Sequence, residues 1–206
     1  MKKTIVSAAF GALALAAGAF ALPGGAWAET APSAVKAGVY KVEPYHTQIS
    51  FTLSHFGLSN YTGVFSGASG SLKLDPAKLE DTKLDVSVAT DTVLTTVPKL
   101  TGELKDDKWL DAAKFPQARF VSTKVTAVGA DEATIAGELT LHGVTKPVVL
   151  KAKFVGAGVN PIDKAYTVGF VASGVIKRTE FGVSKYAPYI GDEVNLTIHA
   201  AFEAAN

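Results

Sequence analysis

The chain has 206 residues, a formal net charge of +1 and no cysteine. The lack of cysteine excludes disulfides, thiolate metal sites and cysteine nucleophiles, and the near-zero charge without a basic cluster excludes the usual footprint of a nucleic-acid-binding protein. Small neutral ligands and transient protein partners remain.

The N-terminus has the pattern of a cleavable secretory signal. Lys2 and Lys3 form a basic start, residues 5–22 carry no charge, and Ala26-Trp27-Ala28 fits the small-x-small rule of signal peptidase. A retained membrane anchor is the alternative, but Pro-Gly-Gly at residues 23–25 breaks the apolar stretch before the cleavage motif. We therefore expect residues 1–28 to be removed and the mature protein to be periplasmic.

The mature chain is expected to form one domain over residues 39–206, preceded by a disordered lead-in at 29–38 that is small, polar and without periodicity. From residue 39 onward, short runs alternate apolar and polar side chains, which is typical of strands with one buried face. In chain order the predicted strands cover residues 39–42, 48–55, 63–74, 84–88, 119–128, 134–141, 148–155, 165–176 and 194–202.

The connections between these runs predict the fold class. Most are short and rich in Gly, Pro, Asn or Asp, with no helical pattern, which favours an all-β antiparallel sandwich or closed barrel over βαβ units. The exception is residues 96–115, where Leu100, Leu104 and Leu110 predict one or two short helices across an open end. A closed barrel of around eight strands has room for side chains or one small ligand, and the predicted inner faces are apolar.

No catalytic or metal motif is present in the sequence. His46 and His55 would point to opposite faces of one strand, while His142 and His199 lie far from both in the sequence. G-x-S-x-G, the phosphate-binding loop and the dinucleotide fingerprint are all missing. We therefore expect no catalytic residue, no metal and no cofactor. A site assembled from several strands stays open as the alternative.

The segment Ile176-Lys177-Arg178-Thr179-Glu180-Phe181-Gly182 is the polar stretch of most functional interest. One interpretation is an exposed rim in which Arg178 pairs with Glu180, a common and weak arrangement. The other is that Arg178 holds the polar or anionic head of a ligand at a pocket mouth, for which a guanidinium is well suited.

Five separated motifs together resemble the YceI-like family of exported lipid-binding proteins. They are Y-x-V-x-P-x-H-x-x-I-x-F-x-x-x-H-x-G at residues 40–57, G-x-F at 63–65 with Gly70, W-L-D-x-x-x-F-P-x-x-x-F-x-S at 109–122, G-E-L-T-L-H-G-V-T-K-P-V at 137–148, and R-T-E-F-G at 178–182. Each motif alone is weak, but five in the same order are specific, and they extend over nearly the whole mature chain.

The resemblance implies an eight-stranded antiparallel, lipocalin-like β-barrel with an apolar tunnel. The ligand that it implies is a polyisoprenoid, such as an isoprenoid quinone, or another long-chain amphiphile, such as a fatty amide. The chain departs from the family at residues 100–104, where Glu103 stands in place of the His of an Arg-Asp-x-His-Leu run. Ligand-head contacts of that loop therefore do not carry over to this chain.

The leading hypothesis is a periplasmic carrier, not an enzyme, that sequesters a long-chain lipid inside the barrel. Strand alternation gives the candidate ligand-binding residues as Phe51, Leu53, Phe65, Trp109, Phe120, Leu141, Phe170, Phe181 and Arg178. One alternative is an enzyme on such a lipid with His46, His55 or His142 as general base. Another is a secreted interaction module with a filled core. A homodimer and transient contact with a membrane or membrane protein stay open.

Overall fold

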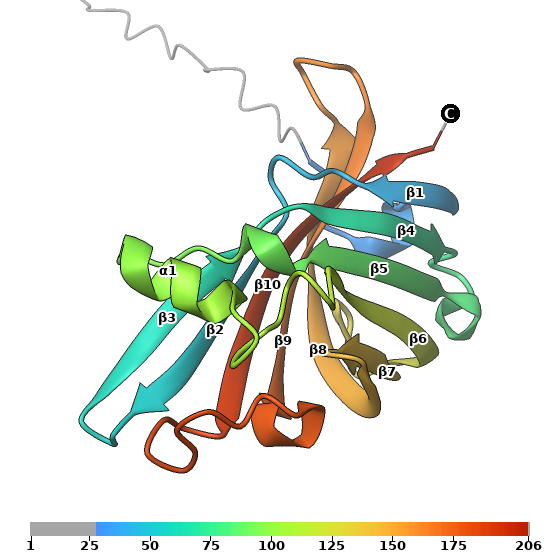
Figure 1. Cartoon of the computed structure of the whole chain (residues 1–206). Helices are drawn as coiled ribbons and strands as arrows, with labels where there is room; N and C mark the ends of the chain where they lie inside the picture. The colour runs from blue at the N-terminus through green and yellow to red at the C-terminus, as the bar shows by residue number, and fades with distance from the viewer. Residues whose placement is uncertain (1–27, 206) are drawn as a thin grey trace, which may run out of the picture.

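The computed structural model describes residues 28–205, and strands make up most of them (Figure 1). The strands are β1 (Gly38–Val42), β2 (Gln48–His55), β3 (Ser59–Phe65), β4 (Ala68–Leu74), β5 (Lys83–Ala89), β6 (Gln117–Ala127), β7 (Glu132–Leu141), β8 (Val144–Val159), β9 (Tyr166–Lys177) and β10 (Glu193–Ala204). The helix α1 covers Pro98–Lys105, and 3-10 turns occur at η1 (Pro32–Ala34), η2 (Leu79–Asp81), η3 (Thr90–Thr92) and η4 (Arg178–Phe181). The predicted signal, apart from Ala28, lies outside the described residues.

The strands close into an antiparallel barrel with eight positions. The ring runs β1-β4-β5-β6-β7-β8-β9-β10, and β1 pairs again with β10. One edge of β10 pairs with β9, while the other pairs with β1 near Phe202 and with β2 over Asn195–His199. Toward the Asn195 end of β10, β2 therefore takes the place that β1 holds near Phe202, and β3 takes the place of β4. This arrangement confirms the predicted eight-stranded antiparallel barrel.

Two segments differ from the sequence-based expectation. The predicted strand over residues 63–74 is two strands that run in the same direction, because Gly67 adopts a left-handed φ of 70° and interrupts the extended backbone between β3 and β4. The expected disordered lead-in at 29–38 lies against the barrel: Glu29 forms a backbone bridge with Ala157, and Val35 is buried in the core. These tertiary contacts order a segment that has no periodicity of its own.

The wall next to β3 is completed by a loop and a helix. Leu94 exchanges two backbone hydrogen bonds with Val64 of β3, at 2.9 and 2.8 Å, and α1 follows four residues later. Pro98 begins the helix, a favoured first position because proline has no N–H to leave unpaired. The predicted short helix between residues 96 and 115 is confirmed.

Among residues 28–205, no helix is long and apolar enough to cross a bilayer.

Two aromatic rings inside the barrel lie directly against glycines of a neighbouring strand. Phe51 covers Gly63 on the neighbouring strand, and Phe120 covers Gly137 in the same way. A Cβ at either glycine would collide with the ring, and at Gly137 also with the carbonyl oxygen of Val121. The missing side chain is therefore what allows each ring to lie close to the wall.

We expect Gly137→Ala to lower the free energy of unfolding by about 1–3 kcal/mol, because the added methyl displaces Phe120 and crowds the Val121 carbonyl. Gly102→Ala, in α1 with no neighbouring atom within 4 Å of the new methyl, is the control and should stabilise the protein by about 0.5–1 kcal/mol. Denaturant unfolding measures both variants. Equal stability of Gly137→Ala and the wild type would contradict the proposed contact.

Candidate functional site

The barrel encloses a cavity of about 320 Å³, at the small end of the range for ligand sites. Every strand contributes to its wall, together with Leu104 of α1 and Trp109 and Leu110 in the turns that follow. Five alternate residues of β10, from Val194 to Phe202, line it and span about 27 Å of strand at about 3.4 Å per residue. The cavity is therefore elongated along the barrel.

The wall of the cavity is almost entirely apolar. The hydroxyls of Thr47 and Thr90 donate to the carbonyl oxygens of Ala201 (3.2 Å) and Phe115 (2.6 Å), so their O–H donors are already used within the fold. The other polar lining residues are Thr82 and Arg178. Such a wall favours a ligand that is mainly hydrocarbon.

Side chains do not fill the interior. Val86, Leu139 and Leu196 point into the barrel and are nevertheless only partly buried, because their remaining exposed surface faces the cavity. Protein cores are normally packed with few voids larger than a water molecule. This arrangement contradicts the alternative of an interaction module with a filled core.

The structure places eight of the nine predicted site residues on the cavity wall. They are Phe51, Leu53, Phe65, Trp109, Phe120, Leu141, Phe170 and Arg178. The ninth, Phe181, is 1% exposed and packs in the core cluster around Phe51 and Phe120 without lining the cavity. Contact of these residues with a ligand stays a prediction.

Most of the lining residues that were not predicted from the sequence are aliphatic. Leu84 and Val86 of β5 and Leu196 and Ile198 of β10 all line the cavity. Their alternation in the sequence already indicates a common face. The prediction selected mainly aromatic residues because each aromatic side chain offers a larger contact area. Thr82 also belongs to the wall and carries no sequence signal.

Trp109 is held at one end of the cavity by the turns that follow α1. Its backbone N–H donates to the carbonyl oxygen of Asp106 (3.0 Å), and the backbone N–H of the next residue, Leu110, donates to the carbonyl oxygen of Leu104 (3.1 Å). The indole is 7% exposed and packs with Val183 and Ile190. Its Nε1–H is buried with no hydrogen-bond partner, and so is the hydroxyl of Thr82 on the same cavity wall.

Arg178 stands beside Trp109 and organises the loop between η4 and β10. The guanidinium is centred 5.5 Å from the indole ring, and the residue is 4% exposed. It donates to the carbonyl oxygens of Gly191 (2.8 Å, Nε), Val183 (2.7 Å, Nη1), Lys185 (3.0 Å, Nη1) and Ile190 (2.6 Å, Nη2). The interpretation of an exposed rim with an Arg178–Glu180 pair is therefore wrong.

The charge of Arg178 is buried against backbone dipoles. Burial lowers the pKa of its guanidinium, and the nearby carboxylate of Asp192 partly offsets this effect. Asp192 is itself held by the backbone N–H of Thr179 (2.9 Å). Four of the five guanidinium N–H groups are engaged in the loop, which leaves one Nη2 hydrogen outside these bonds.

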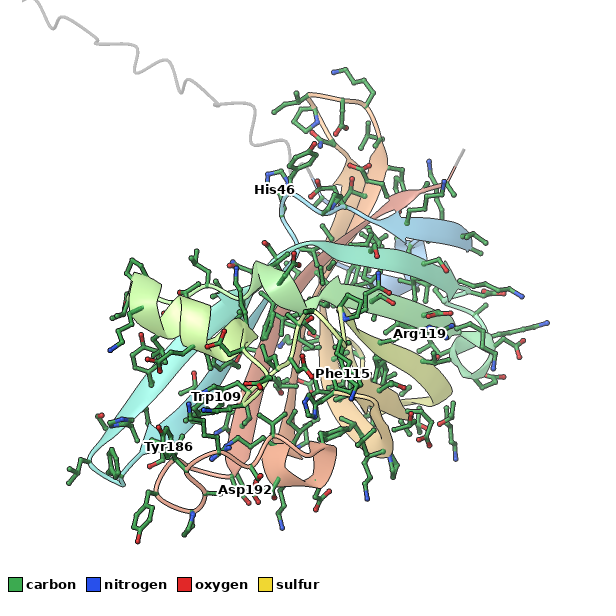
Figure 2. The ribbon with its side chains drawn as sticks, in the orientation of Figure 1. His46, Trp109, Phe115, Arg119, Tyr186 and Asp192 are labelled. Atoms are coloured by element: carbon green, nitrogen blue, oxygen red, sulfur yellow. The ribbon has the colours of Figure 1, made fainter. Side chains whose placement is uncertain are left out.

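The three histidines of the enzyme hypothesis lie on separate elements with different partners. His46 is largely exposed and contacts the Glu43 carboxylate at 2.7 Å. His55 stacks edge-on against Phe56 at the tip of the β2–β3 hairpin. His142 shares a hydrogen bond of 3.1 Å with the carbonyl of Phe181. Figure 2 shows His46 at the opposite end of the barrel from Trp109.

Glu43 is held by backbone donors. Burial alone would raise its pKa, but hydrogen bonds from the backbone N–H groups of Tyr45 and His46 and from the His46 ring lower the pKa below its usual value. The carboxylate thus serves the turn between β1 and β2. Among the described residues, no group of three or more His, Asp or Glu side chains could hold a metal ion.

We expect Arg178→Met to destabilise the protein by about 2–5 kcal/mol, because four buried carbonyl groups lose their donor. Lys177→Met, at the exposed end of β9, is the control and should change stability by less than about 0.5 kcal/mol. Thermal unfolding followed by circular dichroism measures both. Similar melting temperatures for the two variants would contradict the structural role of Arg178.

Residues 40–202 match the family model of the YceI-like domain. The chain belongs to the YceI-like family. A UPF0312 protein of Pseudomonas fluorescens is 39% identical over 189 residues, covering 88% of this chain and 87% of the relative. The membership confirms the resemblance seen in the five motifs.

Solved structures share the fold. The YceI protein of Campylobacter jejuni is 30% identical with a TM-score of 0.66, and the match covers 74% of this chain and 90% of that one. A structure described as a polyisoprenoid-binding domain from Saccharophagus degradans has a TM-score of 0.61 at 15% identity, and the match covers 82% and 100% of the two chains. The second similarity establishes the barrel only.

Proposed function

We propose that the protein is an exported periplasmic carrier that sequesters a long-chain isoprenoid, or a similar amphiphilic lipid, inside the barrel. The observation that carries this proposal is the elongated apolar cavity, to which every strand of the barrel contributes. The description of the Saccharophagus degradans neighbour as polyisoprenoid-binding supports the same ligand class. Non-catalytic sequestration is part of the proposal, whereas a homodimer stays an open alternative.

The free energy of burying hydrocarbon is sufficient for such binding. Transfer of roughly 15–20 carbons from water, at about 0.8 kcal/mol each, provides about 12–16 kcal/mol before ordering costs. Micromolar affinity requires only about 8 kcal/mol. An ionic anchor is therefore unnecessary for affinity, and polar groups in the wall are free to determine orientation.

The polar groups of the wall support a direction for the ligand. The buried Nε1–H of Trp109 has no partner, and Arg178 beside it has one guanidinium hydrogen outside its loop bonds. Two donors therefore lie together at this end, whereas the unpaired Thr82 hydroxyl stands alone before β5. An unpaired buried donor costs free energy. A ligand acceptor would recover it after a side-chain shift that brings the indole N–H to the cavity surface, because this atom is itself fully covered. We therefore place a head group with a hydrogen-bond acceptor, such as a quinone carbonyl, at the α1 and η4 end. The apolar tail extends toward Leu74 and Phe202, near β1.

The first test is native mass spectrometry of the purified mature protein, followed by organic extraction. We expect a stoichiometric long-chain lipid, or uptake of added isoprenoid quinone by the extracted protein. A protein that contains no lipid and takes up no quinone would overturn the proposal.

Ala172→Phe should reduce quinone binding by at least about tenfold, because Ala172 lies on the cavity wall and the ring would occupy the ligand's space. The control is Ser173→Phe at the next position of β9, which is exposed on the outer face and should bind normally. Titration of a fluorescent isoprenoid, displaced by quinone, measures both. Equal affinities would show that the ligand lies elsewhere.

Trp109→Phe tests the head-group assignment, because it keeps an aromatic ring and removes the N–H. We expect quinone affinity to fall by up to about tenfold, as for the loss of one hydrogen bond, while squalene, a hydrocarbon without an acceptor, keeps its affinity. Equal losses for quinone and squalene would indicate a packing effect and contradict the proposed orientation.

A further inference from the structure

We propose that the barrel end next to Trp109 carries a docking surface for an anionic lipid bilayer. The surface consists of two loops, residues 54–60 at the β2–β3 tip and residues 182–191 between η4 and β10, called here the docking loops. The inference rests on the proposed function, since a carrier of a water-insoluble chain must bring its cargo end to the membrane.

Large apolar side chains gather at the tips of the docking loops. Phe56, Leu58, Tyr186 and Tyr189 are 53%, 87%, 60% and 69% exposed. The loops are joined, because the backbone N–H of Phe56 donates to the carbonyl of Tyr189 at 2.9 Å and their rings lie 6.4 Å apart. The exposed residues therefore form one surface.

The backbone of the hairpin tip is unfavourable for the residue that it carries. Phe56 and Gly57 have φ values of 57° and 68°, and Leu58 donates back to the carbonyl of His55 at 3.1 Å. A two-residue turn with two positive φ angles strongly prefers Asn-Gly. A bulky residue in this region is an outlier, and such strain is concentrated at functional sites. Phe56 thus stands at a position that its own turn disfavours.

The charges of the docking loops suit an anionic membrane. Residues 54–60 and 182–191 contain no Asp or Glu, and Lys185 places its ammonium 4.9 Å from the centre of the Tyr186 ring. The carboxylate of Asp192, where the second loop meets β10, accepts the backbone N–H of Thr179. Tyrosine rings with a polar tip are enriched where hydrocarbon meets headgroups, and a lysine beside them can reach anionic headgroups. The loops can thus enter the interface without burying a carboxylate.

The same surface leads directly to the proposed head-group site. Tyr186 packs edge-on against Trp109 at 6.2 Å, and Trp109 lines the cavity. Figure 2 shows these two residues at the same end of the molecule, with His46 at the other. A bilayer bound to the docking loops would therefore lie next to the polar end of the cargo.

A bilayer fits this surface better than a second copy of the chain. Stable protein interfaces use about 20–30 residues from each partner and bury about 800 Å² per side. The docking loops present four large apolar side chains at projecting tips, which is little for such an interface. Shallow insertion of a few side chains into headgroups requires no extended flat surface.

The test is flotation of the full mature protein with vesicles of phosphatidylethanolamine and phosphatidylglycerol. We expect the double variant Phe56→Asn, Leu58→Ser to partition at least about tenfold more weakly than the wild type, because two inserting side chains are removed. The matched control is Tyr45→Ser, Ile162→Ser. These residues are 91% and 89% exposed and belong to the β1–β2 and β8–β9 loops. Figure 1 shows these loops at the other end of the barrel, and this variant should float like the wild type.

Quinone binding and thermal stability are measured on all three proteins. The Phe56→Asn, Leu58→Ser variant should keep or raise the melting temperature, because asparagine suits the turn and the Leu58 side chain is 87% exposed. Lost flotation with an unchanged melting temperature is then not caused by unfolding. Equal flotation of the two double variants, or a wild type that binds quinone and does not float, would overturn the docking surface. If the Phe56→Asn, Leu58→Ser variant is a monomer, the wild type is a dimer and the two float equally, the surface is an interface between copies, and this outcome would also overturn the membrane-docking proposal. Flotation by a protein that binds no quinone would refute the carrier function alone.

Discussion

The pairing of β10 is the constraint on which the rest of the structure depends. One of its edges is fully paired with β9, and the other is shared between β1 and β2. This double pairing closes eight positions into a ring, and ring size fixes how much space the inward side chains must fill. With small residues such as Ala152, Ala172 and Ala200 among larger aliphatic ones, the interior is left as a cavity.

The sequence predicts the barrel wall well, because alternation is a local property that a closed antiparallel sheet preserves. It fails where tertiary contacts or a single backbone angle decide. Gly67 looks like any glycine within a strand, yet its left-handed φ separates β3 from β4. Val35 lies in a polar segment without periodicity, and only its burial against the barrel orders that segment. Neither feature is encoded by the pattern of neighbouring residues.

In the candidate site, too, the sequence predicts the residues of regular strands and fails for those in turns and loops. Alternation places Phe51, Phe120 and Phe170 correctly on the cavity wall, because each belongs to a regular strand. Phe181 is different, since it belongs to a 3-10 turn where a period of two has no meaning, and it packs beneath the wall. The hydrogen bonds of Arg178 join residues 5–13 positions away through backbone carbonyls, which no side-chain motif reveals.

The wall is not equally strong all the way round. Neighbouring strands such as β9 and β10 are joined by long ladders, whereas β3 is joined to the loop before α1 by the two backbone bonds between Val64 and Leu94. Local opening requires the loss of every bond along a boundary, so its free energy is lowest where the bonds are fewest. The barrel therefore has a seam along β3, and parting it would expose the cavity from the side while the ladders of the ring stay intact.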